Sequence, residues 1–216
     1  IYKLEPANTA LEPLVMRELL ELEKDLLGED FNPFAQQNKR YNKRPRSNAT
    51  ARLVELQAFV NKVVVEKKSA NPKLWILAEA TLEMLAGDYF YARESLARLA
   101  REQPEDTLAE QLGILREVTN VLALNRINDS VELYYFDLLA NLKVRDKYPG
   151  LKPLVNDKLK AVYLANGREG KAALLQYGFD AIQKNPAISK VKEMEMMADS
   201  LLGNRFDKAL LADRVG

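Results

Sequence analysis

A turn residue followed five positions later by a small residue recurs along this chain at nearly regular intervals. The pairs are Gly87 with Ala92, Asn125 with Ser130, Gly167 with Ala172 and, with one extra position, Gly203 with Ala209. The turn residues are separated by 38, 42 and 36 positions. Because a period of about 40 residues is typical of stacked helix pairs, this spacing predicts an all-α chain built from helix–turn–helix units.

The clearest of these units begins with a helix that we expect over residues 72–86. Its sequence, LWILAEATLEML, is apolar at helical spacing, and Asn71 and Pro72 provide an expected cap and a first-turn proline. Gly87 can adopt the left-handed conformation that ends a helix. Asp88 is expected to accept hydrogen bonds from the free N–H groups of the next helix. These signals together predict two helices joined by a tight turn.

The same signals predict ten helices in five antiparallel pairs along the whole chain. They lie near residues 9–27, 48–68, 72–86, 88–102, 105–124, 127–146, 150–166, 168–184, 187–202 and 204–214. Residues 29–47 are polar, contain two prolines and lack a helical stripe, so we expect a loop inserted into the first pair. Residues 1–216 are then interpreted as a single repeat domain, an α-solenoid. Its short last helix lacks the polar outer face that is expected of a terminal cap, which favours a fragment of a longer array.

The unit at residues 72–104 carries the turn, small and terminal residues of a known repeat family in their usual order. They are Ala80, Gly87, Asp88, Tyr89, Ala92 and Pro104. In this order the unit resembles a degenerate tetratricopeptide repeat, although the repeats here are longer than the roughly 34 residues of that family. The resemblance implies a superhelix of helix pairs that binds a protein or peptide along its concave face, without catalysis.

The composition excludes most catalytic and metal-binding chemistry. The chain has no cysteine and no histidine, which excludes disulfides, thiolate nucleophiles, histidine bases and most transition-metal sites. Two carboxylate pairs, Glu79 with Glu83 and Glu195 with Asp199, lie one helical turn apart and have the spacing to share a proton or a magnesium ion. Such pairs are more often exposed and balanced by neighbouring cations. We therefore expect a protein that is not an enzyme and needs no cofactor.

The charge and hydropathy of the chain favour no nucleic acid or membrane partner overall. Lysine and arginine total 32 against 31 for aspartate and glutamate, so any basic surface is local. No window approaches the roughly 20 apolar residues of a membrane span. We therefore expect a soluble chain without a membrane-spanning helix.

Polar residues at helical spacing are candidates for contacts with a protein or peptide partner. Arg116 and Asn120 lie four positions apart in one predicted inner helix, and Asn156, Lys160 and Tyr163 follow at steps of four and three in another. Each set shares one helix face, so its donors can converge on a peptide backbone or an acidic side chain. The alternative interpretation is an ordinary solvated helix face.

A run of basic residues in the predicted insertion suggests a different partner. It contains Lys39, Arg40, Lys43, Arg44 and Arg46, with Arg52 just beyond. Residues 39–52 could bind nucleic acid or another anionic surface through their positive charge, with a binding constant that falls as salt is added. A solvated loop with no binding role is the other interpretation, because the rest of the chain is nearly neutral.

Overall fold

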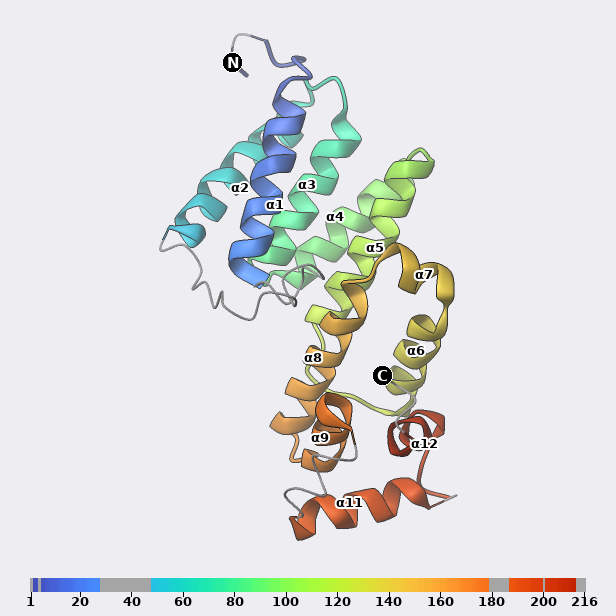
Figure 1. Cartoon of the computed structure of the whole chain (residues 1–216). Coiled ribbons are helices and arrows are strands. Elements are labelled where there is room, and N and C mark those ends of the chain that lie inside the picture. The colour runs from blue at the N-terminus through green and yellow to red at the C-terminus, as the bar shows by residue number, and fades with distance from the viewer. Residues whose placement is uncertain (1, 4, 28–47, 179–186, 200, 213–216) are drawn as a thin grey trace. The chain divides into compact units, whose positions relative to one another are not determined.

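The computed structural model describes residues 2–3, 5–27, 48–178, 187–199 and 201–212. Within these ranges the chain forms eleven helices and no strand (Figure 1), which confirms the all-α prediction. Contacts between Cα atoms divide it into two compact units, which we call unit 1 (Ile1–Ala123) and unit 2 (Leu124–Gly216). The interpretation of residues 1–216 as one repeat domain stays a prediction. None of the described helices is both long and apolar enough to cross a membrane.

Unit 1 contains five helices in the described ranges. They are α1 (Leu11–Leu27), α2 (Ala49–Glu66), α3 (Pro72–Leu85), α4 (Tyr89–Arg101) and α5 (Asp106–Leu122). Each begins and ends within about two residues of its predicted range. Helix α3 contacts α1, α2, α4 and α5, so it lies at the centre of the unit. The predicted loop at 29–47 lies outside the described residues.

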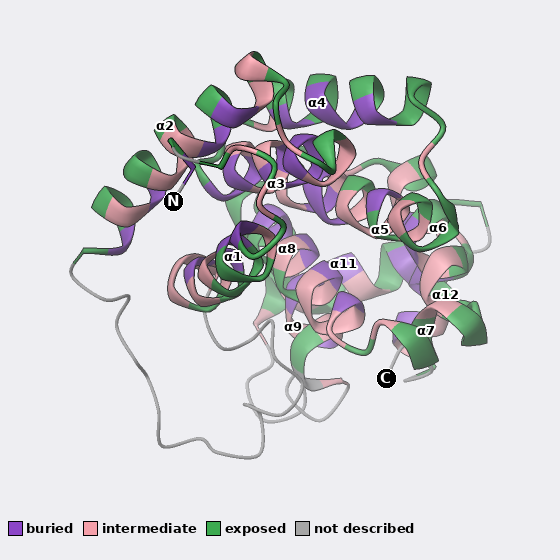
Figure 2. Cartoon of the chain, turned by 90° about the horizontal axis from the view of Figure 1, so that it is seen from above, coloured by how far each residue is buried: buried purple, intermediate pink, exposed green. Residues whose placement is uncertain are grey.

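The core of unit 1 follows from the apolar character of α3. Ile76, Leu77 and Ala80 of this helix pack against Leu96 and Leu99 of α4, and Leu112 of α5 completes the cluster. Figure 2 shows that the buried residues of α4 lie on the side of this helix that faces α3. A helix that is apolar on nearly all faces, as α3 is, must be covered on several sides. The surrounding helices provide that cover.

The turn between α3 and α4 has the geometry that the glycine predicts. Gly87 has a φ of +84°, its N–H donates to the Met84 carbonyl at 3.0 Å, and the Asp88 N–H donates to the Glu83 carbonyl at 2.9 Å. These two hydrogen bonds define a Schellman motif. Ala92, five positions after the glycine, is completely buried. A small residue here lets the two helices approach closely.

The turn between two helices of unit 2, α8 (Leu151–Ala165) and α9 (Glu169–Tyr177), repeats this geometry. Gly167 has a φ of +72°, and its N–H donates to the Leu164 carbonyl at 3.2 Å. The Arg168 N–H donates to the Tyr163 carbonyl at 2.8 Å, and Ala172 is 2% exposed. The two motifs are 80 positions apart, which is twice the predicted period.

The other turn residues and the predicted caps behave differently. Among the described residues, neither Asn125 nor Gly203 has a positive φ, so their turns are of another kind. The Asp88 side chain makes no capping hydrogen bond to α4, and Asn71 makes none to α3, so the predicted side-chain caps are wrong. The Asn71 amide instead donates to the Glu12 carboxylate at 2.7 and 2.9 Å, which ties the start of α3 to α1.

Alanine at the two turn glycines is expected to lower the free energy of unfolding by about 1–2 kcal/mol, because a side chain in the left-handed region is strained. No atom lies within 4 Å of a Cβ built at Gly87 or Gly167, so strain rather than collision causes the loss. Gly113→Ala is the matched control: this glycine lies within α5 and also has open space, so alanine should stabilise by roughly 0.5–1 kcal/mol. Urea unfolding of the variants measures both the expected loss of stability at the turns and the expected gain at Gly113.

Unit 2 contains six helices in the described ranges. They are α6 (Asp129–Ala140), α7 (Leu142–Lys147), α8, α9, α11 (Ile188–Ala198) and α12 (Arg205–Leu211). The single helix predicted over 127–146 is wrong, because Asn141 is extended and its side chain caps α7 by accepting from the Lys143 N–H at 3.0 Å. Helix α9 ends at Tyr177, before Gly178 with its φ of +65°. The rest of the range predicted for this helix lies outside the described residues.

Candidate functional site

A pocket of about 260 Å³ opens between α2 and α3 of unit 1. One part of its lining is apolar and the other is polar or acidic. The apolar residues are Val54, Ala58, Val60 and Leu82, and the polar residues are Gln57, Asn61, Glu79 and Glu83. The carboxylate pair that the sequence places one turn apart on α3 therefore lines this pocket.

The two carboxylates of the pocket differ in their partners. The Arg98 guanidinium of α4 forms an ion pair with Glu79, and the Ser95 hydroxyl donates to the same carboxylate at 3.3 Å. Within the described part of the chain, Glu83 Oε2 is buried and has no hydrogen-bond partner. Burial raises the pKa of Glu83, a hydrogen bond from the Ser95 hydroxyl lowers it, and the negative charge of Glu79 raises it further. Glu83 is thus the less well compensated of the two acids.

In the ranges that the structure describes, no group of three or more acidic residues has the geometry of a metal site. The second predicted pair, Glu195 and Asp199, belongs to the end of α11, where both side chains are exposed. The pair in the pocket of unit 1 is therefore the more buried of the two.

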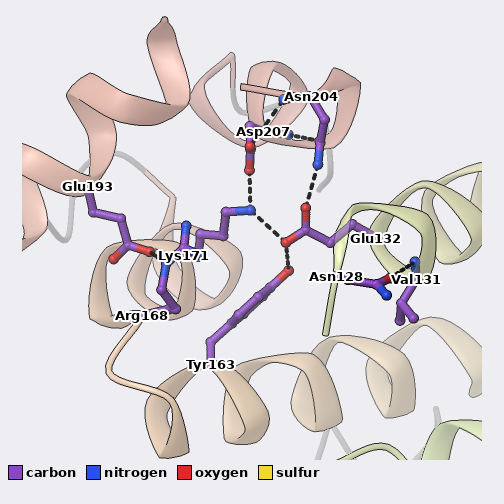
Figure 3. A network of polar contacts seen from close by, with 9 residues as sticks. All are labelled: Asn128, Val131, Glu132, Tyr163, Arg168, Lys171, Glu193, Asn204 and Asp207. Atoms are coloured by element: carbon purple, nitrogen blue, oxygen red, sulfur yellow. Dashed lines mark hydrogen bonds and ion pairs between the residues drawn. The ribbon is translucent and has the colours of Figure 1, made fainter. Parts of the chain in front are cut away.

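Unit 2 contains a buried polar network centred on Glu132 of α6 (Figure 3). The Glu132 carboxylate accepts hydrogen bonds from the Tyr163 hydroxyl at 2.7 Å, the Lys171 ammonium at 2.6 Å and the Asn204 amide at 2.6 Å. These donors come from α8, from α9 and from the cap of α12. One side chain therefore joins four helices of the unit.

Lys171 is the cation of this network and is 2% exposed. Its Nζ lies 2.6 Å from Glu132 Oε1 and 2.5 Å from Asp207 Oδ1, and 5.7 Å from the centre of the Tyr163 ring. Asp207 also forms a capping box with Asn204, whose side chain accepts from the Asp207 N–H at 3.0 Å. The network thus combines a buried ion pair with the start of α12.

A second carboxylate of unit 2, Glu193 of α11, binds the first turn of α9. It accepts from Arg168 Nε at 2.5 Å and from the Gly170 N–H at 2.6 Å. A negative charge near the start of a helix is favourable because the free N–H groups there carry positive partial charge. A Cβ built at Gly170 would lie 2.7 Å from Glu193 Oε2, so only glycine leaves room for this contact.

The buried network holds helices together and does not present a ligand surface. Glu132, Lys171 and Asp207 are 2–4% exposed, and each makes short contacts to the others or to Asn204. Burial, together with the negative charge of Glu132, raises the pKa of Tyr163 far above its ordinary value. The hydroxyl therefore remains protonated and continues to donate. These groups are poor candidates for chemistry on an external substrate.

The polar residues proposed to contact a partner lie on two helices in different units. On α5, Arg116 is exposed and within 4.0 Å of Glu117, and Asn120 accepts a hydrogen bond from Arg93 at 3.1 Å. On α8, Asn156 and Lys160 are half-buried. The third residue of that helix, Tyr163, is 3% exposed and belongs to the buried network.

The sequence contains one local signal of the buried network, at the start of α12. The sequence NRFD places Asn204 three positions before Asp207, which is the spacing of a capping box. Nothing in the linear pattern pairs Glu132 with Lys171, which lies 39 positions later.

The basic residues of the predicted insertion, Lys39 to Arg46, lie outside the described residues. Arg52, which follows them, is described and is 18% exposed in its side chain. It forms ion pairs with Glu18 and with Asp25, the latter at 3.1 Å, and so joins α2 to α1. The charge of Arg52 is therefore already neutralised within unit 1.

Comparison with known proteins adds no family to these observations. No family model, curated protein or solved structure matches the chain. The function is therefore inferred from the geometry of the two units.

Proposed function

We propose that this chain is a non-enzymatic binding module, a solenoid of helix pairs similar to tetratricopeptide repeats, that holds a protein or peptide partner along a concave face. The observation that carries the proposal is the recurrence of one helix-pair geometry in both units. The turns at Gly87 and Gly167 share a Schellman motif and are each followed by a buried alanine. Repeated pairs of this kind leave an extended surface that is suited to binding rather than to catalysis.

The surface of such a module needs apolar area for affinity and polar groups for orientation. Apolar burial contributes roughly 25 cal/mol for each Å² removed from water. Arg116 and Asn120 would orient a partner on α5, and Asn156 and Lys160 would do so on α8. Tyr163 would support binding indirectly, because its hydrogen bond to Glu132 holds α8 in place.

The Asn156→Ala, Lys160→Ala double variant is expected to reduce partner capture at least tenfold and to leave the thermal midpoint nearly unchanged. Both side chains are half-buried on one face of α8, and neither belongs to the buried network. Capture is measured by pull-down from the native source with quantitative mass spectrometry, followed by titration of the identified partner. Lys143→Ala, which removes an exposed lysine of α7, is the control. Equal capture by the double variant and the control would remove these residues from the proposal.

The alternative partner is nucleic acid or another anionic surface bound through residues 39–52. This alternative predicts that binding of a labelled oligonucleotide falls steeply as salt is added and disappears when residues 39–46 are deleted. The capture that depends on Asn156 and Lys160 should survive the same deletion.

A further inference from the structure

The pocket between α2 and α3 has more negative than positive charge around it. The carboxylate of Glu83 is subject to the charges of Glu79, Asp88 and Arg98, two of them negative and one positive. The single guanidinium is already paired with Glu79. The Ser95 hydroxyl, which donates to Glu79 at 3.3 Å and also lowers the pKa of Glu83 by hydrogen bonding, carries no charge. Glu83 is therefore left without a cation of its own, in a pocket that has room for one.

The remaining lining of the pocket suits an aliphatic chain. Val54, Val60 and Leu82 supply apolar walls beside the acidic end. A cavity of about 150 Å³ is large enough to bind a benzene molecule, so a pocket of about 260 Å³ has room for a chain of several methylenes. A group that is apolar along its length and cationic at its tip buries its stem and keeps its charge beside a counter-ion.

We propose that this pocket binds the side chain of a lysine from a partner segment, with its methylenes against the apolar walls and its ammonium paired with Glu83. The inference rests on the proposed function for the source of the lysine. The chemistry of the pocket itself requires only a primary ammonium on an aliphatic chain. The amides of Gln57 and Asn61 lie at the same pocket and offer acceptors to the other ammonium protons.

The state of Glu83 without a ligand supports this assignment. A carboxylate oxygen that is buried without a hydrogen bond destabilises the folded chain. Residues that serve binding are often retained at such a cost in stability. Glu79 plays a different part, because it holds the Arg98 guanidinium in an ion pair, and that charge compensates Glu83 only in part.

The test measures binding of a capped pentapeptide, Ala-Ala-Lys-Ala-Ala, to the full chain by calorimetric titration. The same peptide with norleucine in place of lysine has the stem without the charge. We expect the lysine peptide to bind at least tenfold more tightly than the norleucine peptide, and Glu83→Gln to remove that difference. Glu102→Gln is the matched control, because Glu102 is exposed in unit 1 and does not line the pocket.

A stability measurement separates a loss of binding in Glu83→Gln from a loss of folding. The pKa of Glu83 is raised in the folded chain, so the fold favours the protonated carboxyl over the carboxylate. The stability that the protonated form provides is complete below the ordinary pKa of 4.5, and it is lost as the pH rises through the pKa in the folded chain. Glu83→Gln should therefore raise the thermal midpoint at pH 7, and this gain should disappear near pH 4. Glu79→Gln should lower the midpoint at pH 7, because it leaves Arg98 without its partner. Fluorescence of Trp75, the one tryptophan of the chain, monitors unit 1.

Titration with n-butylammonium distinguishes a lysine side chain from a free amine. If this ion binds through Glu83 and the lysine peptide binds no better than the norleucine peptide, the ligand is a small amine and the lysine assignment is overturned. If Glu83→Gln changes neither affinity, the pocket is not the site. Partner capture that depends on Asn156 and Lys160 would stand in either case, so failure here is separate from failure of the proposed function.

Discussion

Replacement of Lys171 by methionine is expected to lower the free energy of unfolding by about 3–5 kcal/mol, which is the usual cost of breaking a buried ion pair from one side. Methionine fills a similar volume, so the loss is one of charge rather than of packing. Glu132 and Asp207, which the ammonium contacts at 2.6 and 2.5 Å, would then be two buried carboxylates without a cation. One of them must take up a proton or become exposed to water for unit 2 to fold.

The measurement for Lys171→Met is urea unfolding followed by circular dichroism, with hydrogen exchange read from peptides of each unit. Protection should fall in α6, α8, α9 and α12. Lys208→Met removes an exposed lysine of α12 and should change stability by less than about 0.5 kcal/mol. Adding Asp207→Asn to Lys171→Met should recover part of the loss, because it removes one uncompensated charge and keeps a side-chain acceptor for the capping box. Equal midpoints for Lys171→Met and Lys208→Met would show that the network contributes no stability.

Alanine at Gly203 is expected to cost about 1–3 kcal/mol or more, as overpacked sites do. A Cβ at this position would lie 2.0 Å from the Met197 carbonyl oxygen and 2.8 Å from its carbon. These are backbone atoms at the end of α11, so no side-chain rotation relieves the collision. The turn that leads from α11 to α12 would have to move, and with it the Asn204 cap.

Thermal unfolding of Gly203→Ala, compared with Gly113→Ala, measures this collision. Both variants add one methyl group, but the space around Gly113 is open. Hydrogen exchange should show faster exchange at the start of α12, where the Asn204 side chain accepts from the Asp207 N–H. A midpoint for Gly203→Ala equal to that of the unchanged chain would mean that the turn adjusts without cost.

The helix pair α3–α4 could be predicted from the sequence because its signals are local. A proline in the first turn of α3, an apolar run and a glycine with open space and positive φ all lie within about twenty residues of one another. The side-chain caps could not be predicted as reliably. Asn71 is the right residue type for a cap, but its amide nitrogen donates to the Glu12 carboxylate of α1, and its side chain makes no capping hydrogen bond to α3.

The break between α6 and α7 could not be predicted, because no glycine or proline marks it. Asn141 lies between Ala140 and Leu142 in a segment that continues a helical pattern. Its side chain hydrogen-bonds to a backbone N–H two positions later, which offers the chain a turn in place of a helix. An asparagine can either continue a helix or cap a new one, and the sequence around Asn141 does not decide between the two.

The two candidate features required contacts that no linear pattern reveals. The sequence placed Glu79 and Glu83 on one helix face, but it did not show that Arg98 of α4 neutralises the first and leaves the second. The hydroxyl of Tyr163 was predicted to face a partner, and the structure places it against Glu132, 31 positions earlier. Helical spacing predicts which residues share a face, but it does not predict whether that face contacts water or another helix.

The hydrogen bond from Asn204 to Glu132 can form only late in the synthesis of unit 2. The two residues are 72 positions apart, so the carboxylate leaves the ribosome long before the amide that it binds. At about 5–20 residues per second, translation of that interval takes roughly 4 to 14 seconds. Lys171 is made 39 positions after Glu132, so their ion pair can form only in the later part of this interval, and its burial is complete only when α12 has emerged.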